Sequence, residues 1–507
     1  MTAMQSSVLK NKSQNHNSEV YVATLDVGTS SVRSLLFNQR AEEMEGFGIQ
    51  IPYEVKTTSD GGVEADADQL AELVVKSLSV LHQQIQEQRL KVSAVACCTF
   101  WHNVLGVDAQ GSPTTPVLHP FDTRADQAAR KLASRIDGRA QHGRTGCVLH
   151  PSYLPAKLLW LAEMNSSAFK SSRYWMSFGE YLFLKLFGKA VASVSMVSGS
   201  GLWNQHENQY DSEILGALPI DISQLSPVEE MDQPLSELRP EYKSQWPAFS
   251  GLPWFPALGD GACNNIGSDC YSPERFALMV GTSGAMRAVY ETSKLEIPYG
   301  LWCYRVDRKR YLFGGALSNG GEVYAWMKRT LALPAEKKIE SELAAMKPGS
   351  HRLTVLPFFA GERSTHWRAD ARAAITGLHA STHPLEILRA ALEAVALRFR
   401  AIYDLMVKSL GVPREVIASG GALLRSPAWS QMMADALGRS VVAYLEKEAT
   451  SRGAAMLALE RLNVISDVSH LQGLRGDTFK PDPSHVPVYE EMLYRQQQLY
   501  VKLFDEE

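Results

Sequence analysis

The tetrapeptide Val-Gly-Thr-Ser occurs twice, at residues 27–30 and 280–283, about half the chain apart. Each copy follows an apolar run that predicts a strand, at residues 21–25 and 276–279. Each also precedes a second such run, at residues 32–37 and 285–290. The pattern predicts strand, tight turn and strand in both copies. A repeat at this separation predicts a fold built from two similar halves.

The repeated turn has the chemistry of a phosphate-binding loop. Its glycine permits a sharp turn, and its short hydroxyl residues leave backbone N–H groups accessible. Since concave sets of N–H groups bind phosphate, two copies facing each other across a cleft could clasp a polyphosphate. Two ordinary β-hairpins remain the alternative. The chain lacks both the G-x-x-x-x-G-K-[ST] motif and the protein-kinase motif set, so phosphoryl transfer here would need a different cradle.

Length and composition restrict the class of protein. A chain of 507 residues predicts at least two domains, and we divide it into residues 20–255 and 256–507. The net charge is −4 and no long Lys/Arg run appears, which argues against nucleic acid as a partner. No apolar run reaches about 18 residues, so we expect no membrane span. The polar residues 1–19 predict a disordered leader rather than a signal peptide.

The six cysteines include no C-x-x-C pair, which argues against zinc and disulfide frameworks. Cys97 and Cys98 lie in an apolar run, so we expect buried thiols. This usage predicts a reducing cytoplasmic setting. The sequence leaves the oligomeric state open, with a homodimer as one option.

Two aspartates are candidates for chemistry. Asp26 ends the first predicted strand, where a carboxylate can hold Mg²⁺ directly or through water, although it could simply cap the turn. Asp260 lies between two glycines after the Pro-rich residues 251–256, which predict a hinge between domains. Clefts form at such junctions, and an aspartate suits the orientation or deprotonation of an acceptor hydroxyl. An ordinary Asp-Gly turn is the alternative.

Paired glycines mark two further candidate sites. Gly420 and Gly421 end an apolar run before a predicted helix at residues 426–437, and Gly320 and Gly321 precede a predicted helix that contains Trp326. Such glycines let a flat ligand or a phosphate approach the backbone, but they are equally typical of strand–helix turns.

Polar residues near two strand ends are candidates for substrate contacts. His102 follows the apolar run of residues 92–100, and polar groups at strand ends often contact ligands, although a lone histidine is often structural. Asp122 and Arg124, two residues apart in one loop, predict either an internal ion pair or a hydroxyl-binding pair.

Together these segments resemble the FGGY carbohydrate kinase family, from about Tyr21 to the C-terminus. Five segments occur in the order of that family: residues 25–31, 259–261, 280–284, 357–363 with Trp367, and 418–422 with residues 429–435. The resemblance implies an α/β fold of two actin-like (ribonuclease H-like) domains with an interdomain cleft. It also implies ATP and Mg²⁺ as cofactors and a small sugar or sugar acid as substrate.

The family's roles transfer to matching positions. The resemblance implies that Asp260 is the general base for the acceptor hydroxyl and that Asp26 helps to organise Mg²⁺. It implies nucleotide contacts from Thr29, Ser30, Arg33, Gly281, Thr282, Gly321, Gly420, Gly421 and Arg425. It implies sugar contacts from His102, Asp122, Arg124 and Asp260.

Gluconokinases of this family share four further features with the chain, which favours D-gluconate as substrate and 6-phosphogluconate as product. These are residues 144–146 followed by His150-Pro151, residues 281–287, Cys303-Tyr304 followed by Gly314-Gly315, and residues 319–321. Pro120 departs from the family, which has a tryptophan there near the substrate. A xylulokinase or another ketose or polyol kinase is therefore the alternative, and a non-catalytic nucleotide-binding protein is a third interpretation. For a substrate carboxylate, Arg124, Arg144, His102 and His150 remain open as partners.

Overall fold

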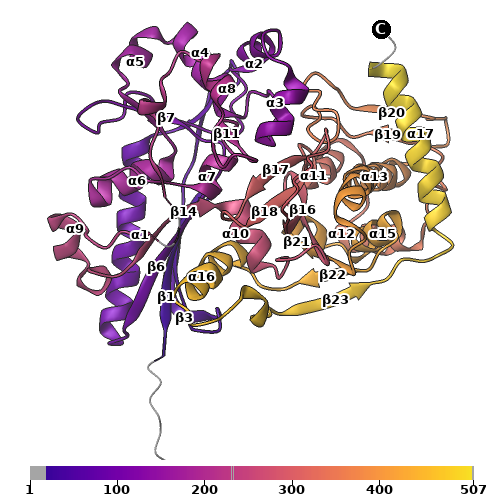
Figure 1. The fold of residues 1–507 in the computed structure, drawn as a ribbon. Helices are drawn as coiled ribbons and strands as arrows, with labels where there is room; N and C mark the ends of the chain where they lie inside the picture. The colour runs from indigo at the N-terminus through magenta and orange to yellow at the C-terminus, as the bar shows by residue number, and fades with distance from the viewer. Residues whose placement is uncertain (1–18, 230, 232, 505–507) are drawn as a thin grey trace, which may run out of the picture.

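The fold is described from a computed structural model, in residues 19–229, 231 and 233–504 (Figure 1). The predicted leader therefore lies outside the described residues, apart from Glu19. Two central sheets, each flanked by helices, lie side by side. The N-terminal sheet has the spatial order β14-β6-β1-β2-β3. Its strands are β1 (Tyr21–Val27), β2 (Ser31–Phe37), β3 (Glu43–Pro52), β6 (Val92–Thr99) and β14 (Trp254–Gly259).

The C-terminal sheet has seven strands in the order β17-β18-β16-β15-β21-β22-β23. Their bounds are β15 (Arg275–Val280), β16 (Gly284–Glu291), β17 (Trp302–Arg305), β18 (Arg310–Leu317), β21 (Glu415–Ser419), β22 (Val441–Tyr444) and β23 (Arg475–Phe479). The remaining strands form small two- and three-stranded sheets: β4 (Lys56–Thr57), β5 (Val63–Ala65), β7 (Leu105–Val107), β8 (Val117–Leu118), β9 (Tyr174–Met176), β10 (Ala192–Ser193), β11 (Trp203–Asn204), β12 (Gln209–Tyr210), β13 (Val228–Glu229), β19 (Thr354–Leu356) and β20 (Ala374–Thr376).

The two central sheets share one topology, which confirms the expectation of two similar halves. In the first, β1, β2 and β3 form an antiparallel meander, and β6 and β14 add in parallel beside β1. In the second, β15, β16 and β18 form the meander, and β21 and β22 add in parallel beside β15. The predicted Val-Gly-Thr-Ser turn joins the first two strands of each meander. The fold is therefore the expected α/β fold with a duplicated core.

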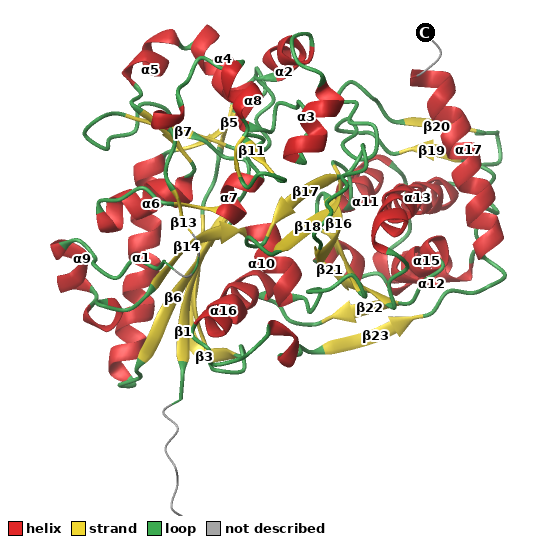
Figure 2. Cartoon of the chain, viewed as in Figure 1, coloured by secondary structure: helices red, strands yellow, loops and turns green. Residues whose placement is uncertain are grey.

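Helices cover both sheets (Figure 2). Those of the first half are α1 (Ala67–Glu87), α2 (Asp126–Ala133), α3 (Gly138–Thr145), α4 (Leu154–Met164), α5 (Ser166–Ser171), α6 (Phe178–Phe187), α7 (Val194–Ser198), α8 (Ser212–Gly216) and α9 (Pro240–Gln245). Those of the second half are α10 (Asp260–Gly267), α11 (Gly321–Thr330), α12 (Glu336–Ala345), α13 (Pro384–Leu410), α14 (Gly421–Leu424), α15 (Pro427–Leu437), α16 (Ala449–Arg461) and α17 (Val486–Phe504). No helix in the described ranges is long and apolar enough to cross a membrane.

Local sequence explains the long helices. Asp66 caps α1 by accepting a hydrogen bond from the Gln69 N–H, and buried residues then recur at helical spacing from Leu70 to Ile85. Pro384 begins α13, where its fixed φ angle fits the first turn. These buried stripes pack α1 on the first sheet and α13 on the second.

The two halves interlock through α10 and α16. Helix α10 follows the edge strand β14 of the first sheet, whereas α16 follows β22 of the second and packs back against β1 and β6. The division predicted after residue 255 falls within β14, so residues 251–256 lead into a strand of the first sheet. That division stays a prediction, because structural elements cross it.

Glycines allow α10 and α16 to pack backbone to backbone. A Cβ atom built on Gly453 would lie 1.8 Å from the carbonyl oxygen of Cys263, and one on Gly267 would lie 1.8 Å from that of Ala449. Any larger side chain at either position would therefore push the helices apart. Asp260 begins α10, so the crossing also sets where this carboxylate lies.

Candidate active site

Asp26 lies in the interior of the first sheet, where β1 ends in the first Val-Gly-Thr-Ser turn. Its side chain is 2% exposed. Arg33, which pairs with it from the neighbouring strand β2, contacts Asp26 Oδ2 through Nη1 at 3.2 Å. Burial raises the pKa of Asp26 to about 6, and Arg33 opposes this shift. Its Oδ1 atom is buried and has no hydrogen-bond partner within the described residues. An unpaired carboxylate oxygen beside a predicted phosphate-binding turn has the chemistry of a magnesium ligand.

The first turn is held by its own backbone and by Tyr53. Gly28 N–H donates to the Ser31 carbonyl, and Tyr53 Oη donates to the Gly28 carbonyl at 2.6 Å. Thr29 is half-buried and Ser30 is exposed at the tip of the turn. These contacts fix the turn and leave its hydroxyl groups available to a ligand.

The second turn lies where three glycine segments meet. Gly321 N–H, at the start of α11, donates to the Gly281 carbonyl, and Gly320 N–H donates to the Thr282 carbonyl. Gly420 has φ +92°, and a Cβ atom there would lie 2.4 Å from the Val280 carbonyl oxygen. The predicted nucleotide glycines are therefore brought together by close backbone contacts that side chains would block.

The last predicted nucleotide residues lie beside these glycines. Gly421 begins α14, and a Cβ atom on it would lie 3.4 Å from Nη1 of the exposed Arg425. Thr29, Ser30 and Arg33 lie in the first half of the chain, with the other predicted nucleotide contacts in the second. A nucleotide that used all of them would bridge the two halves.

Asp260 is the first residue of α10, directly after β14. Its Oδ1 accepts the Gly261 N–H at 2.8 Å, and burial raises its pKa. The Trp101 backbone and the Arg287 guanidinium oppose that rise. Val27 and Gly259, the neighbours of Asp26 and Asp260, both pair with Thr99 of β6, so the two aspartates lie on either side of one strand, and the charge of Asp260 raises the pKa of Asp26. The structure thus brings together the two aspartates predicted from separate motifs.

An aromatic cluster from both halves of the chain surrounds His102. The His102 ring centroid is 4.9 Å from that of Tyr153 and 5.4 Å from that of Tyr304. The Tyr153 and Tyr304 hydroxyls are 2.6 Å apart and hydrogen-bonded. Trp101 contacts Tyr304, with ring centroids 5.0 Å apart, and a Cβ atom on Gly259 would lie 1.9 Å from the Trp101 ring. The cluster therefore adjoins the Asp260 segment.

The histidines in this cluster are neutral donors and acceptors. His102 has φ +62° and donates from Nδ1 to the Gly199 carbonyl at 2.7 Å. Burial lowers the pKa of both His102 and His150 to about 3, and the charge of Arg363 contributes. Near neutral pH, neither ring carries the positive charge that a carboxylate partner would supply.

Asp122 and Arg124, for which the sequence predicted either an internal ion pair or a hydroxyl-binding pair, form the ion pair. Arg124 also pairs with Glu64 at 3.0 Å and lies over the Trp160 ring at 4.6 Å. Asp122 Oδ2 accepts the Val63 N–H as well. These contacts occupy both residues, and their contact with a sugar stays a prediction.

A lysine outside the predicted set connects the segments that carry the predicted sugar-binding residues. Lys157 is buried and donates to the carbonyls of His102, at 2.5 Å, and His119, at 2.9 Å. It thereby connects the segments that carry His102 and Asp122. Its two acceptors lie 38 and 55 residues away in the chain, so no local sequence pattern predicts this role.

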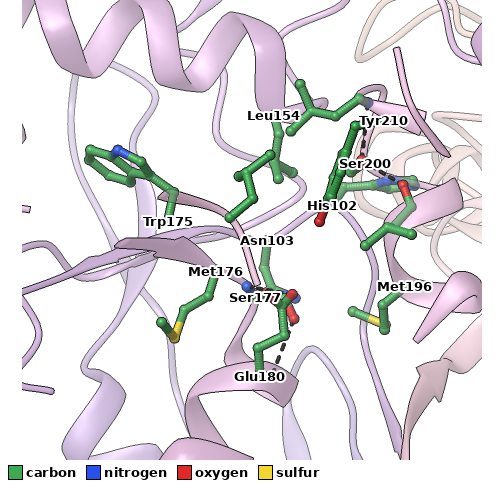
Figure 3. A pocket seen from close by; sticks show the side chains of 13 residues that line it. His102, Asn103, Leu154, Trp175, Met176, Ser177, Glu180, Met196, Ser200 and Tyr210 are labelled. Carbon is green, nitrogen blue, oxygen red and sulfur yellow. Dashed lines mark hydrogen bonds between the residues drawn. The ribbon is translucent and has the colours of Figure 1, made fainter. Parts of the chain in front are cut away.

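A small cavity of about 30 Å³ lies beside His102 within the first half (Figure 3). Its walls are mostly apolar, with Leu154, Trp175 and Met196 among them, and Glu180 is also present. A single water needs roughly 10–15 Å³, so the cavity holds about two waters. It is too small for a six-carbon substrate.

Sequence reasoning also gave no role to Tyr153, Tyr304 or Arg287. Tyr304 and Arg287 lie in segments that suggested the family resemblance, so that resemblance was the available signal. Residues 144–146 and Cys303-Tyr304, two of the segments shared with gluconokinases, contact each other, since the Cys303 N–H donates to the Gly146 carbonyl at 3.0 Å. Tyr153 carries no comparable signal, because its partner Tyr304 is 151 residues away.

Several known proteins are similar to this chain. It is 26% identical to a gluconokinase from Bacillus subtilis (strain 168) over 478 residues, covering 91% of this chain and 92% of the relative. Solved structures of a gluconate kinase and of a ligand-bound xylulose kinase, both from Lactobacillus acidophilus, each match with a TM-score of 0.89 and 25% identity. Each match covers 96% of this chain and 98% of the solved chain.

Family models match both halves. The N-terminal domain of the FGGY family of carbohydrate kinases matches residues 21–267, and the C-terminal domain matches residues 276–460. The first match ends with α10 at residue 267, the second begins at residue 276, and together they cover most of the chain. The chain belongs to the FGGY family of carbohydrate kinases.

Proposed function

We propose that this carbohydrate kinase transfers the γ-phosphoryl group of ATP to the terminal hydroxyl of D-gluconate, forming 6-phosphogluconate. One observation carries the proposal: Asp26, beside the first Val-Gly-Thr-Ser turn, and Asp260 lie at the carboxyl ends of β1 and β14, which flank β6, and Asp260 adjoins Trp101 in the aromatic cluster. A base between a phosphate site and an acceptor site suits in-line transfer. The similarity to gluconokinase and gluconate kinase supports gluconate as the acceptor.

In this mechanism Asp260 accepts the proton of the acceptor hydroxyl while the oxygen–phosphorus bond forms. The bond between the γ-phosphorus and the bridging oxygen breaks, and ADP leaves with that oxygen. Burial raises the pKa of Asp260, which brings a carboxylate closer to the basicity useful near neutral pH. Backbone N–H groups of the two Val-Gly-Thr-Ser turns hold the phosphates and stabilise charge on the transferred group.

Asp26 is the residue that would hold Mg²⁺. Its unpaired, buried Oδ1 fits a ligand role, and no cluster of three or more metal-ligating side chains occurs among the residues that the structure describes. This agrees with the usual binding of Mg²⁺ by one or two carboxylates together with substrate phosphates. When bound, Mg²⁺ would neutralise charge on the β- and γ-phosphate oxygens.

An acceptor panel tests the proposed substrate. ADP release should be measured with D-gluconate, D-xylulose, D-ribulose and glycerol under identical conditions. We expect kcat/KM to be highest for gluconate, with phosphorylation at its terminal hydroxyl. A preference for xylulose or ribulose would replace gluconate with a ketose, and ATP turnover that no acceptor stimulates would contradict a sugar kinase.

The Asp260→Asn variant tests the base. The substituted amide would keep an oxygen to accept the Gly261 N–H, so the fold should persist. We expect turnover to fall roughly 10²–10⁴-fold, the range for a lost general base. The matched control is Asp477→Asn on the exposed face of β23, which should retain wild-type turnover. Near wild-type turnover in Asp260→Asn would remove Asp260 from this role.

A further inference from the structure

Arg287 is a buried arginine at the boundary between the two halves. It lies on β16, the strand that follows the second phosphate loop, and is 6% exposed. Its guanidinium crosses to α10, where Nη1 donates to the Gly261 carbonyl at 3.3 Å and Nη2 donates to Asn264 Oδ1 at 3.2 Å. It therefore adjoins the residue that follows Asp260.

No carboxylate forms an ion pair with Arg287 anywhere in the described chain. A guanidinium has five N–H donors, and here two hydrogen bonds reach neutral acceptors while the buried Nε has no partner. Asp260 acts on Arg287 electrostatically without an ion pair. Burying a charge without a hydrogen-bonded counter-charge is costly, so this site favours an anion that completes the pair.

The other cations on this side differ from Arg287: Lys157 is buried but compact and donates to two carbonyls, and the remaining arginines are paired with carboxylates or less buried. Arg124 pairs with Asp122 and Glu64, and Arg144 pairs with Asp211 and Glu213. Arg363 is half-buried over the Trp367 ring at 5.6 Å, so solvent reaches part of it. The sequence left four residues open as partners of a substrate carboxylate. Of these, Arg124 and Arg144 are engaged in ion pairs, and the other two, both histidines, are neutral.

Arg287 faces the acceptor side of Asp260. A Cβ atom on Gly261 would lie 2.6 Å from Arg287 Nη1 and 2.7 Å from Trp101 Cζ3, so the guanidinium and the indole meet over this glycine. Trp101 contacts Tyr304 and lies 6.2 Å from His102, centroid to centroid, in the aromatic cluster. A ligand bound between Asp260 and the cluster would therefore lie beside Arg287 Nη1, which donates one of its two hydrogens to the Gly261 carbonyl.

We propose that Arg287 binds the carboxylate of an acidic acceptor and so selects sugar acids over neutral sugars. This inference rests on the proposed sugar-kinase function, but it holds for any aldonate or uronate and not for gluconate alone. Arginine suits this role because its planar fork can donate two parallel hydrogen bonds to one carboxylate.

The test compares a charged and a neutral acceptor that differ at one carbon. D-Glucitol has the carbon chain of D-gluconate with a hydroxymethyl group in place of the carboxylate. Both should be assayed with wild type, Arg287→Gln and Arg287→Lys, and glucitol should be measured as a competitive inhibitor where turnover is undetectable. Glutamine keeps an amide donor for the Gly261 carbonyl but removes the charge. The exposed Arg135→Gln is the matched surface control.

We expect Arg287→Gln to lower kcat/KM for gluconate about 10²-fold, chiefly through KM, because a buried charged partner is lost. The KM or inhibition constant for glucitol should change less than about threefold, whereas a change in kcat that follows from the effect of Arg287 on the pKa of Asp260 should be shared by both acceptors. Arg287→Lys should restore part of the gluconate affinity, since it restores charge without the fork. If thermal unfolding shows that Arg287→Gln does not fold, Arg287→Lys takes its place as the test. A ratio of the constants for gluconate to those for glucitol that equals the wild-type ratio then overturns the inference.

The remaining outcomes separate the two proposals. Equal losses on both acceptors would mean that Arg287 acts on the phosphoryl group or on Asp260, which overturns the inference alone. Loss of gluconate preference in Arg363→Gln but not in Arg287→Gln would also overturn it and assign the role to Arg363. A wild type that prefers another sugar acid, with that preference lost in Arg287→Gln, supports the inference and refutes gluconate. A wild type that prefers neutral sugars overturns both.

Discussion

The crossing of α10 and α16 leads to a quantitative prediction for Gly453→Ala. The new Cβ atom would lie 1.8 Å from the Cys263 carbonyl oxygen, whereas ordinary contacts begin at 3.4 Å. The helices must therefore separate by about 1.6 Å, the difference between these distances, or distort by an equivalent amount. Because the obstructing atom belongs to a helix backbone, no side-chain rotation can relieve the contact.

Overpacking of this kind costs about 1–3 kcal/mol, and a rigid backbone neighbour favours the upper part of that range. Alanine recovers up to about 1 kcal/mol relative to glycine through helix propensity. We therefore expect a net destabilisation of about 2 kcal/mol. For a folding unit of 150–250 residues, each kcal/mol lowers Tm by about 2–4 °C, so Tm should fall by about 4–8 °C.

The assay is thermal unfolding of wild type, Gly453→Ala and Gly143→Ala. Gly143 lies in α3, and a Cβ atom there would meet nothing within 4 Å, so alanine should stabilise by about 0.5–1 kcal/mol. Gly267→Ala should resemble Gly453→Ala, and the double variant should lose less than the sum, because one separation relieves both contacts. A Tm for Gly453→Ala at or above wild type would refute the proposed backbone contact.

Three further predictions concern the site. Burial lowers the pKa of Lys157 to about 7, so between pH 7 and 10 the unfolded chain binds one more proton at this residue than the folded chain does. The free energy of unfolding of wild type, measured in urea relative to Lys157→Met, should therefore rise from pH 7 to pH 10. A difference between the two proteins that stays constant over this range would contradict the prediction. Tyr153→Phe and Tyr304→Phe should each lower the free energy of unfolding by about 1–3 kcal/mol, because each leaves the other buried hydroxyl without its partner. If the double variant loses as much stability as the two single variants together, the two hydroxyls do not form this hydrogen bond. Asp26→Asn should raise the Mg²⁺ concentration for half-maximal activity about 10–100-fold, and an unchanged Mg²⁺ dependence would exclude Asp26 as a ligand.

The duplicated core could be predicted from the sequence because its signals are local. Each Val-Gly-Thr-Ser turn is flanked by apolar runs that form β1, β2, β15 and β16 nearly where the pattern indicates. Burial on both sheet faces makes such runs continuous in apolar residues, and the turn needs its glycine whatever the rest of the chain does. The fold class was predictable for the same reason.

The acceptor side could not be assembled from sequence, because its contacts join distant segments. Tyr153 and Tyr304 meet across 151 positions, and neither residue type nor spacing predicts that pairing. Whether Arg287 finds a carboxylate partner depends on which carboxylates the fold leaves out of its reach, a property of packing rather than of any motif. Residues 251–256 read as a hinge because of their prolines, whereas pairing with β6 draws this segment into the first sheet.

The aromatic cluster draws residues from both halves of the chain, as do the predicted nucleotide contacts. Tyr153 belongs to the first half and Tyr304 to the second, so a rotation of one half against the other would change the proposed acceptor site and the predicted nucleotide contacts together. Thermodynamic linkage then makes the two affinities reciprocal. If ATP tightens acceptor binding by some factor, the acceptor must tighten ATP binding by that same factor, and calorimetric titrations in either order should return one coupling free energy.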